Sequence, residues 1–576
     1  MRRTSGDGRL MVCLALLNML ALGGCYEGVQ IPAAFEPPEN EGVGAGEETT
    51  GPEVPEDPPN GDGDGEEEAA LPPPSLRLLS AHEYENSVRD LLQVDFESDI
   101  YWGDAHTGFD NGALAQLDQS LVSLLVLEAE TVAGRYVEER LLLEYPCFSE
   151  APPSSACVAD FVDSFGLRAY RRPLTESDRG TLVDFAAALQ VEGPDGPELA
   201  QWMVTRMLVS PKFLYRVEGG RLDGADPASV DVFDRASIIS YAMTGSMPDS
   251  LLLADALNGA LDEEATAAAH IRRLAQTPRG QEQLLRFAKQ WLRVSGLDRM
   301  RDQPEEFSKL PSAEMGRSLA DEFDLFVETT LLNSGTLKDL LLGTTYHVDE
   351  ETAPLYGLQA PAGPEMTPVQ APEGRVGVFG LASVLATHAS SALVHRDKPI
   401  ARGMMIKNQF LCEEIGLPSG IDIDSAAEDA GVIEEFDQMT SREQLETIMN
   451  QGEICVTCHQ TFMTYGFLFA NYDALGQYQT HFGDRVLDAH VDNLLLDGEL
   501  GNYTGSAAFV PALAQSDQVA ACYAEQVARF IAGSNDGVLT ERLAEDFEGF
   551  DADDIMLDLF EKMLLHPSVY ERETTP

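Results

Sequence analysis

Basic residues are scarce in this sequence. Its 576 residues include 38 Lys and Arg against 97 Asp and Glu, so the formal net charge is -59. Binding to a phosphate backbone requires clustered cations, and no basic stripe is present, so we expect no nucleic-acid partner. The same deficit argues against electrostatic docking on anionic lipid headgroups. A solvated acidic surface that stays soluble by self-repulsion is the simplest interpretation.

Long apolar runs are also missing, which excludes a transmembrane helix after the N-terminus. The run at residues 10–22 follows three arginines and ends in Leu22-Gly23-Gly24-Cys25. A basic start, a short apolar middle and a small-residue exit are typical of a signal peptide. The exit resembles the bacterial lipobox, so we predict Cys25 as the lipidation site that anchors the mature protein to a membrane. The alternative is an ordinary signal peptide with an incidental cysteine.

Residues 26–75 lack any base and contain 14 acids among many Pro and Gly. Such a composition cannot bury enough apolar surface to offset the loss of chain entropy. We predict a disordered tether between the anchor and the folded body. The N-terminal features together predict a bacterial cell-envelope protein at the periplasmic or outer-membrane surface.

Alternating strand patterns are scarce in the remaining chain, and helical patterns are common. Ser80 and Glu83 form a predicted capping box, and Thr175 begins a similar helix. Further helices are predicted at Ile238–Leu257, Gln283–Val294 and Leu319–Leu332. We find no fixed-period repeat.

The predicted export of the protein separates the eight cysteines into those of the signal and anchor and those of the exported body. Cys13 leaves with the signal and Cys25 is the lipid site, so six remain in a compartment that permits disulfides. Cys147 and Cys157 bracket a short loop and form the natural local pair. Cys412 and Cys522 are then left for a second bridge, although six cysteines allow 15 connectivities.

The most specific chemical motif is Cys455-Val456-Thr457-Cys458-His459. Two thiols three residues apart attach covalently to the vinyl groups of one haem, and the adjacent histidine becomes the proximal iron ligand. We therefore predict one haem c at Cys455, Cys458 and His459. A helix capped by Thr440 or Ser441 is expected just before it.

Three other interpretations of the motif stay open. Cys455 and Cys458 are candidates for a redox dithiol, for a zinc site with His459 and a fourth ligand, or for a degenerate haem site closed as a disulfide. No thioredoxin-like pattern surrounds the motif and no second Cys-x-x-Cys lies nearby. The first absence argues against a redox dithiol and the second against a zinc site, so haem is favoured over both.

The distal iron ligand is less well defined. Met463 shares a helical face with His459 and cannot reach the opposite side of the haem. We favour His490, or else His481, while a surface histidine is the alternative for each. Candidates further along lie in a segment that we interpret as a tail: Met556, Met563 and His566.

Other catalytic patterns are weak. No Walker, Rossmann or Gly-x-Ser-x-Gly motif is present. His388 and His395, with Ser390, Ser391 and Asp397, invite a hydrolase interpretation, but a polar loop is the better one. Arg171 and Arg172 are anion-binding candidates, for which a structural ion pair is the better interpretation.

Several phrases resemble modular planctomycete-type cytochrome-like proteins, also found as myxobacteria-like lipoproteins, whose domains are mostly of unknown function. The phrases begin at Leu79, Arg168, Ser210, Gly245, Gln290, Arg375 and Arg402, and end with the block from Cys455 to Gly476. The resemblance implies a mainly helical architecture with a C-terminal Cys-x-x-Cys-His module, and it implies no established reaction.

We therefore predict a mainly α fold in which a multi-domain helical platform carries a small C-terminal cytochrome c-like module. The predicted bounds are 1–25 for the signal, 26–75 for the linker, 76–145, 146–225 and 226–350 for helical domains, 351–440 for a linker and small domain, and 441–576 for the cytochrome c-like domain.

The leading functional hypothesis is a lipid-anchored protein that passes single electrons in the envelope and docks an envelope protein or polymer. A non-redox scaffold or polysaccharide-associated binding protein with a structural motif is the alternative. A haem or metal enzyme is the third class, and the sequence assigns no reaction to it.

Overall fold

The computed structural model describes residues 75–102, 108–112, 117–218, 230–303, 310–361, 363–388, 399–413, 438–449, 462–533 and 538–570. The predicted signal peptide, Cys25 and the acidic segment 26–74 lie outside these residues. So does the whole motif Cys455, Cys458 and His459. The described parts of residues 68–576 form one compact unit.

The described chain is mainly α-helical, which confirms the predicted fold class. Its few strands pair only as four antiparallel two-stranded sheets, and these sheets do not join one another. None of the described helices is long and apolar enough to cross a bilayer.

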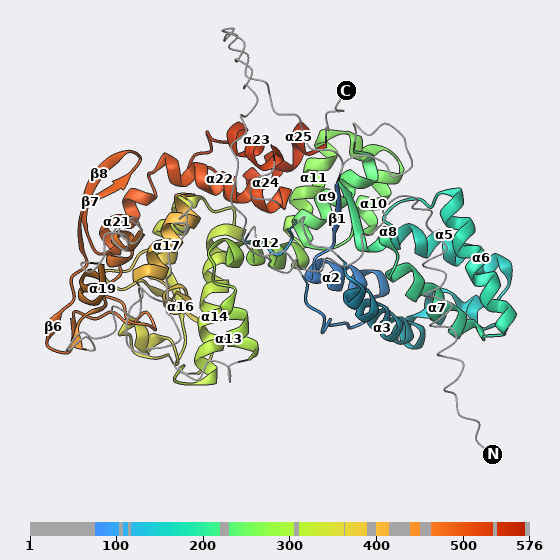
Figure 1. Cartoon of the computed structure of the whole chain (residues 1–576), viewed down its shortest axis with the longest axis horizontal. Helices are drawn as coiled ribbons and strands as arrows, with labels where there is room; N and C mark the ends of the chain where they lie inside the picture. The colour runs from blue at the N-terminus through green and yellow to red at the C-terminus, as the bar shows by residue number, and fades with distance from the viewer. Residues whose placement is uncertain are drawn as a thin grey trace, which may run out of the picture. The chain divides into compact units, whose positions relative to one another are not determined.

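The N-terminal part is a layer of helices closed by one short sheet (Figure 1). Strand β1 (Ser75–Leu78) pairs with β2 (Tyr215–Glu218), so the two ends of this part meet. The helices between them are α2 (Ala81–Leu92), α3 (Gln119–Tyr136), a π-helical turn (Val137–Leu141), α4 (Leu142–Glu144), α5 (Ser155–Ala169), α6 (Glu176–Glu192), α7 (Gly196–Leu208) and α8 (Pro211–Leu214).

The middle part is a succession of helices. They are α9 (Val232–Thr244), α10 (Ser250–Leu257), α11 (Glu264–Ala275), α12 (Pro278–Trp291), α13 (Gly296–Asp302), α14 (Ala313–Val327) with a π-helical turn (Glu328–Leu332), α15 (Leu337–Leu342) and α16 (Ala382–Thr387). One antiparallel pair, β3 (Thr345–Val348) with β4 (Thr367–Gln370), lies among them. The predicted helix over Ile238–Leu257 is two helices, because Gly245 ends α9 with a φ of 58° and Pro248 follows.

The C-terminal part mixes helices with two hairpins. The helices are α17 (Pro399–Phe410), α19 (Ser441–Met449), α21 (Ser506–Leu513), α22 (Asp517–Ala532), α23 (Val538–Asp546), α24 (Met556–Leu565) and α25 (Pro567–Tyr570). The hairpins are β5 (His481–Phe482) with β6 (Arg485–Val486), and β7 (His490–Leu496) with β8 (Glu499–Thr504).

The predicted helix starts are confirmed. Ser80 Oγ accepts the Glu83 N–H, and the Glu83 carboxylate accepts the Ser80 N–H, so both orphan donors at the start of α2 are satisfied. Thr175 caps α6 through the Asp178 N–H. Thr440 caps α19, the helix predicted just before the Cys-x-x-Cys-His motif.

One continuous hydrophobic core joins the middle and C-terminal parts. At its centre Trp291, on α12, is 1% exposed and packs against Phe410 of α17 and Tyr523 of α22, with ring centroids 5.3 and 5.1 Å apart. Its indole N–H donates to the Gln409 carbonyl at 2.8 Å. Burial of these large rings ties three distant chain segments together.

The C-terminal end belongs to this core, so its interpretation as a tail was wrong. Met556 and Met563 on α24 are each 0% exposed, and Phe560 packs edge-on against Phe287 of α12. The apolar residues of α24 recur at helical spacing and therefore form a buried face. In Figure 1 this helix lies among the other helices of the core.

The structure contains both of the disulfides that the sequence favoured. Cys147 pairs with Cys157 at the start of α5, and Cys412 after α17 pairs with Cys522 on α22. The second bridge links segments 110 residues apart.

Candidate functional site

The residues on either side of the motif are held in a close-packed frame. Described residues resume at Phe462, in a helical stretch that crosses α17. A Cβ at Gly403 would lie 2.0 Å from the Phe462 carbonyl oxygen, and one at Gly466 would lie 1.8 Å from the Pro399 carbonyl oxygen. Only glycine permits backbones to approach this closely.

Arg402 organises the turn that follows this stretch. Its side chain is 0% exposed, and its guanidinium donates to the carbonyls of Phe469, Tyr472 and Asp473 at 3.2, 2.7 and 2.6 Å. It also donates to the Leu385 carbonyl of α16 at 3.3 Å. A rigid fork with five donors suits several carbonyls at once.

A second set of contacts fixes the same stretch from outside. The Tyr465 hydroxyl donates to the Leu495 carbonyl of β7, and the Lys407 ammonium lies 5.1 Å from the Tyr465 ring centroid. Arg442 of α19 lies 4.8 Å from the Phe467 ring centroid. The flanks of the motif are therefore anchored to α17, α19 and β7.

The two favoured distal ligands have exposed side chains, His481 on β5 and His490 on β7. His490 is paired through both ring nitrogens, Nδ1 with Thr504 Oγ1 at 2.8 Å and Nε2 with Asp492 at 3.1 Å. Coordination of iron through Nε2 would require it to leave Asp492. The Nδ1 atom of His481 pairs with Thr480 Oγ1 at 2.9 Å. Because the motif lies outside the described residues, both assignments stay predictions.

The later candidates have structural partners. His566 pairs with Asp546 at 3.3 Å, while Met556 and Met563 are core residues. Among the residues that the structure describes, no group of three or more His, Cys, Asp and Glu is arranged to hold a metal ion.

His388 has a structural role in the described part of the chain. Its Nε2 lies 3.0 Å from the Leu292 carbonyl oxygen, and burial lowers the pKa of His388 to about 4. The imidazole is therefore neutral, with its proton on Nε2. Its proposed hydrolase partners Ser390, Ser391, His395 and Asp397 lie outside the described residues.

The double arginine is structural, as the sequence analysis favoured. Arg171 is 4% exposed and donates to the carbonyls of Lys212, Phe213 and Tyr215 at 3.0, 3.0 and 2.8 Å. Arg172 pairs with Asp231 at 3.1 Å and also contacts Asp234. These pairs join the end of α5 to the start of α9.

Asp234 should make stability depend on pH. Burial, which outweighs the attraction of Arg172, raises the pKa of this carboxyl to about 7. A carboxyl with a raised pKa takes up a proton on folding, so its contribution favours the folded state at acid pH and is lost as pH rises through 7. We expect Asp234→Asn to remove this dependence and to stabilise the protein at about pH 8 by roughly 1 kcal/mol or more.

Urea unfolding of the native protein and the variant at about pH 5.5 and pH 8 measures this effect. Asp163→Asn is the matched control, because Asp163 pairs with Arg179 on the surface with 51% of its side chain exposed. Equal pH dependence in the Asp234 variant and the native protein would contradict the assignment.

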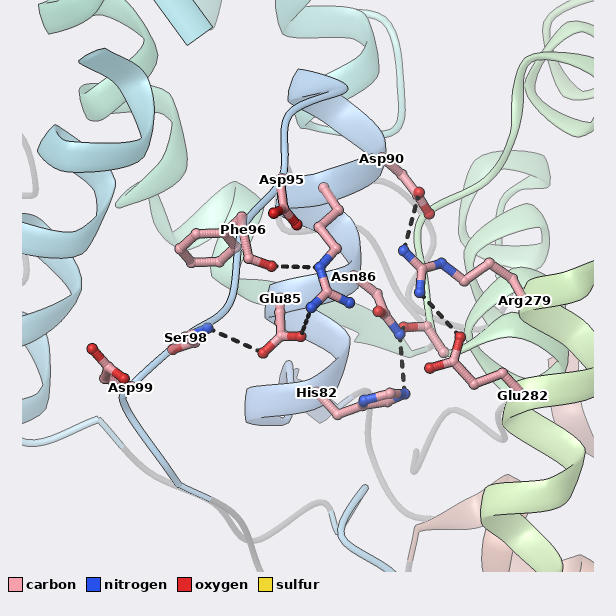
Figure 2. Close-up of polar contacts among 12 residues, drawn as sticks. His82, Glu85, Asn86, Asp90, Asp95, Phe96, Ser98, Asp99, Arg279 and Glu282 are labelled. Carbon is pink, nitrogen blue, oxygen red and sulfur yellow. Dashed lines mark hydrogen bonds and ion pairs between the residues drawn. The ribbon is translucent and has the colours of Figure 1, made fainter. Parts of the chain in front are cut away.

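Helix α2 carries a polar network, and Figure 2 shows its contacts. Arg89 pairs with Glu85 and donates to the Phe96 carbonyl, while Ser246 donates to Asp90 at 2.6 Å. Arg279 bridges Asp90, at 3.6 Å, to Glu282, at 3.1 Å.

His82 completes this network. The Asn86 amide donates to its Nε2 at 3.0 Å and to the Gly245 carbonyl at 3.3 Å. Burial, reinforced by Arg286, holds the pKa of His82 well below its ordinary value. His82 is therefore neutral with its proton on Nδ1, which is the tautomer that can accept from Asn86.

Two cavities flank α2. One, of about 710 Å³, is lined by Asp90 together with residues of α5, α9, α10 and the start of α12. The other, of about 570 Å³, is lined by Arg89, the segment 95–100 and α3. Neither was predicted, because their walls come from segments up to about 190 residues apart in the chain and no single motif marks them.

The fold and these sites define a modular, mainly helical protein, and four family models match its successive parts. Each is described as a protein of unknown function: PSD3 (DUF1587) over residues 77–138, PSD5 (DUF1595) over 157–218, PSD4 (DUF1592) over 230–358 and PSCyt3 (DUF1588) over 375–482. No curated protein and no solved structure matches the chain. The modular part of the predicted resemblance is confirmed.

Proposed function

We propose that this protein is an exported, lipid-anchored carrier of one haem c that transfers single electrons in the bacterial envelope. The observation that carries the proposal is Cys455-x-x-Cys458-His459, which lies inside the segment matched by PSCyt3, a family name that hints at a cytochrome-like character. Two thiols at this spacing and an adjacent imidazole are the donor set for covalent haem attachment.

Different residues of the chain would bind different parts of the haem. Cys455 and Cys458 would form the thioether bonds, and His459 would bind the iron. His490 or His481 would supply the distal ligand. A bound haem c would supply one-electron chemistry, with a lower potential for two histidines than for histidine and methionine. The frame around α17, with Arg402 and the paired glycines, would limit movement of the flanks.

Export and anchoring support the same proposal. Haem c is attached after export, and the signal-like run at residues 10–22 ends at Cys25. The acidic segment 26–75 would space the folded body from the membrane by chain stiffness and charge repulsion. The large helical part would dock an envelope protein or polymer that exchanges the electron.

Expression with and without haem-maturation machinery tests the proposal. A denaturing gel stained for haem should show a coloured band only after export with that machinery. Labelled palmitate should be incorporated into the native chain and not into the Cys25→Ser variant. A colourless, unlabelled chain under both conditions would contradict the proposal.

A second candidate function is a non-redox binding platform in which the motif is structural. The cavity of about 710 Å³ beside α2 favours it, since such a volume suits a small-molecule ligand. Haem staining separates the two candidates, because a binding platform would carry no covalent haem.

A further inference from the structure

The larger cavity lies where three of the matched segments meet. Asp90 belongs to the segment matched by PSD3, Arg168 to that matched by PSD5, and α9, α10 and Arg279 to that matched by PSD4. Small-molecule sites occur preferentially at such junctions, and about 710 Å³ lies within their usual range of roughly 300–1,000 Å³.

The wall of the cavity is mainly apolar. It is lined by Leu253 and Leu257 of α10, by Leu274 of α11 and by Met247 in the turn before α10. Leu253 and Leu274 are 6% and 2% exposed, so this wall is backed by the protein core. An apolar group that enters the cavity gains by leaving water.

The charges of the cavity are balanced, in contrast to the chain as a whole. Two acids, Asp90 and Asp249, line it with two bases, Arg168 and Arg279, whereas the chain has 97 acids and 38 bases. Asp249 is already paired with Arg273 at 2.6 Å, so Asp90 is the acid that faces a ligand without a close cationic partner. A purely cationic ligand would meet both arginines, and a purely anionic one would meet Asp90. The balance therefore disfavours either kind of simple ion.

The charged groups also retain capacity for a ligand. The Arg279 guanidinium lies 3.6 Å from Asp90, and that of Arg168 lies 3.7 Å from Glu144. Arg279 also donates to Glu282 at 3.1 Å, and Arg168 donates to the Leu91 carbonyl. Each guanidinium has five N–H donors, so donors remain on each arginine for a ligand. Asp90 accepts from Ser246 through Oδ2, while its Oδ1 faces Arg279.

We propose that this cavity binds a small zwitterionic amphiphile. The apolar part lies against α10 and α11, the anionic group faces Arg279 and Arg168, and the cationic group faces Asp90. Because the site is complete only when three segments are docked, a ligand also stabilises their docking. This proposal is independent of haem attachment.

The test uses the full chain with Cys25→Ser, so that neither an acyl anchor nor detergent competes. The probes are octylphosphocholine, octyl sulfate and octyltrimethylammonium below their micelle concentrations, measured by titration calorimetry and thermal unfolding. We expect saturable binding of octylphosphocholine with one site per chain, a rise in Tm, and at least about tenfold weaker binding of the other two.

Ala254→Trp fills the cavity from α10 and should weaken octylphosphocholine binding at least about tenfold. Leu251→Trp is the matched control on the same helix, because Leu251 is 59% exposed and does not line the cavity. Its binding should equal that of the native chain. No saturable binding, or equal binding in both variants, would overturn the proposal.

Asp90→Asn is a second variant that tests the proposal even if Ala254→Trp fails to fold. It removes one negative charge from the rim and keeps an oxygen for the Ser246 hydroxyl. We expect the preference to shift from octylphosphocholine toward octyl sulfate by about tenfold. An unchanged ratio of the affinities for octylphosphocholine and octyl sulfate would show that Asp90 does not determine which ligand charge is preferred. That result would overturn the zwitterion assignment.

Discussion

Arg402→Leu should lower the free energy of unfolding by about 3–5 kcal/mol. The substitution removes a fully buried guanidinium that donates to four carbonyls of α16 and of the turn at residues 469–473. Leucine offers no donor, so the Leu385 and Tyr472 carbonyls would lose this partner at the cost of part of their desolvation energy. The Phe469 and Asp473 carbonyls would keep only their backbone N–H donors. The large effect is expected because one buried side chain links α16 to the turn.

Urea denaturation followed by circular dichroism measures this change. The matched control is Arg272→Leu, since Arg272 has 68% of its side chain exposed and pairs only at the surface with Glu561 in the contacts described. We expect that control to stay within about 1 kcal/mol of the native protein. Arg402→Leu with native stability would mean that the carbonyls of the turn find other donors.

The Cys412–Cys522 disulfide should contribute more to stability than Cys147–Cys157. The first closes a sequence separation of 110 residues and the second one of 10. In the chain-entropy model the loss of the longer loop costs about 5 kcal/mol and the loss of the shorter one about 3 kcal/mol. The difference arises in the unfolded chain, where the longer bridge removes more conformations.

Paired Cys→Ala variants test this ranking. Cys412→Ala/Cys522→Ala and Cys147→Ala/Cys157→Ala serve as controls for each other, because each loses one buried or half-buried bridge. Thermal unfolding should give the lower Tm for the first pair. The reverse order would show that local packing, rather than loop closure, determines the contribution of each bridge.

Local signals in the sequence predicted local structure well. The capping residues Ser80, Thr175 and Thr440 identify helices that the structure contains, because a cap depends on residues within one turn. The pairing of Cys412 with Cys522 followed from assigning the other cysteines first. Arg172 was correctly interpreted as an ion pair, although the sequence did not indicate its partner Asp234.

Features that depend on tertiary contacts could not be predicted. Met556 and Met563 lie near the chain end, a position typical of a tail, but both are core residues because tertiary contacts bury their helix. The role of Arg402 follows from carbonyls up to 71 residues away, which no sequence pattern marks. The cavity beside α2 combines Asp90, Arg168 and Arg279, whose proximity arises only from the docking of three segments.

Electron transfer by this protein requires a covalent haem on Cys455 and Cys458. The most direct measurement is the pyridine haemochrome spectrum of the exported protein, produced with haem-maturation machinery, beside that of Cys455→Ala/Cys458→Ala. We expect the spectrum of haem c at one haem per chain in the native protein and no such spectrum in the variant. An exported native protein without covalent haem would contradict the electron-transfer function and leave the motif as a structural element.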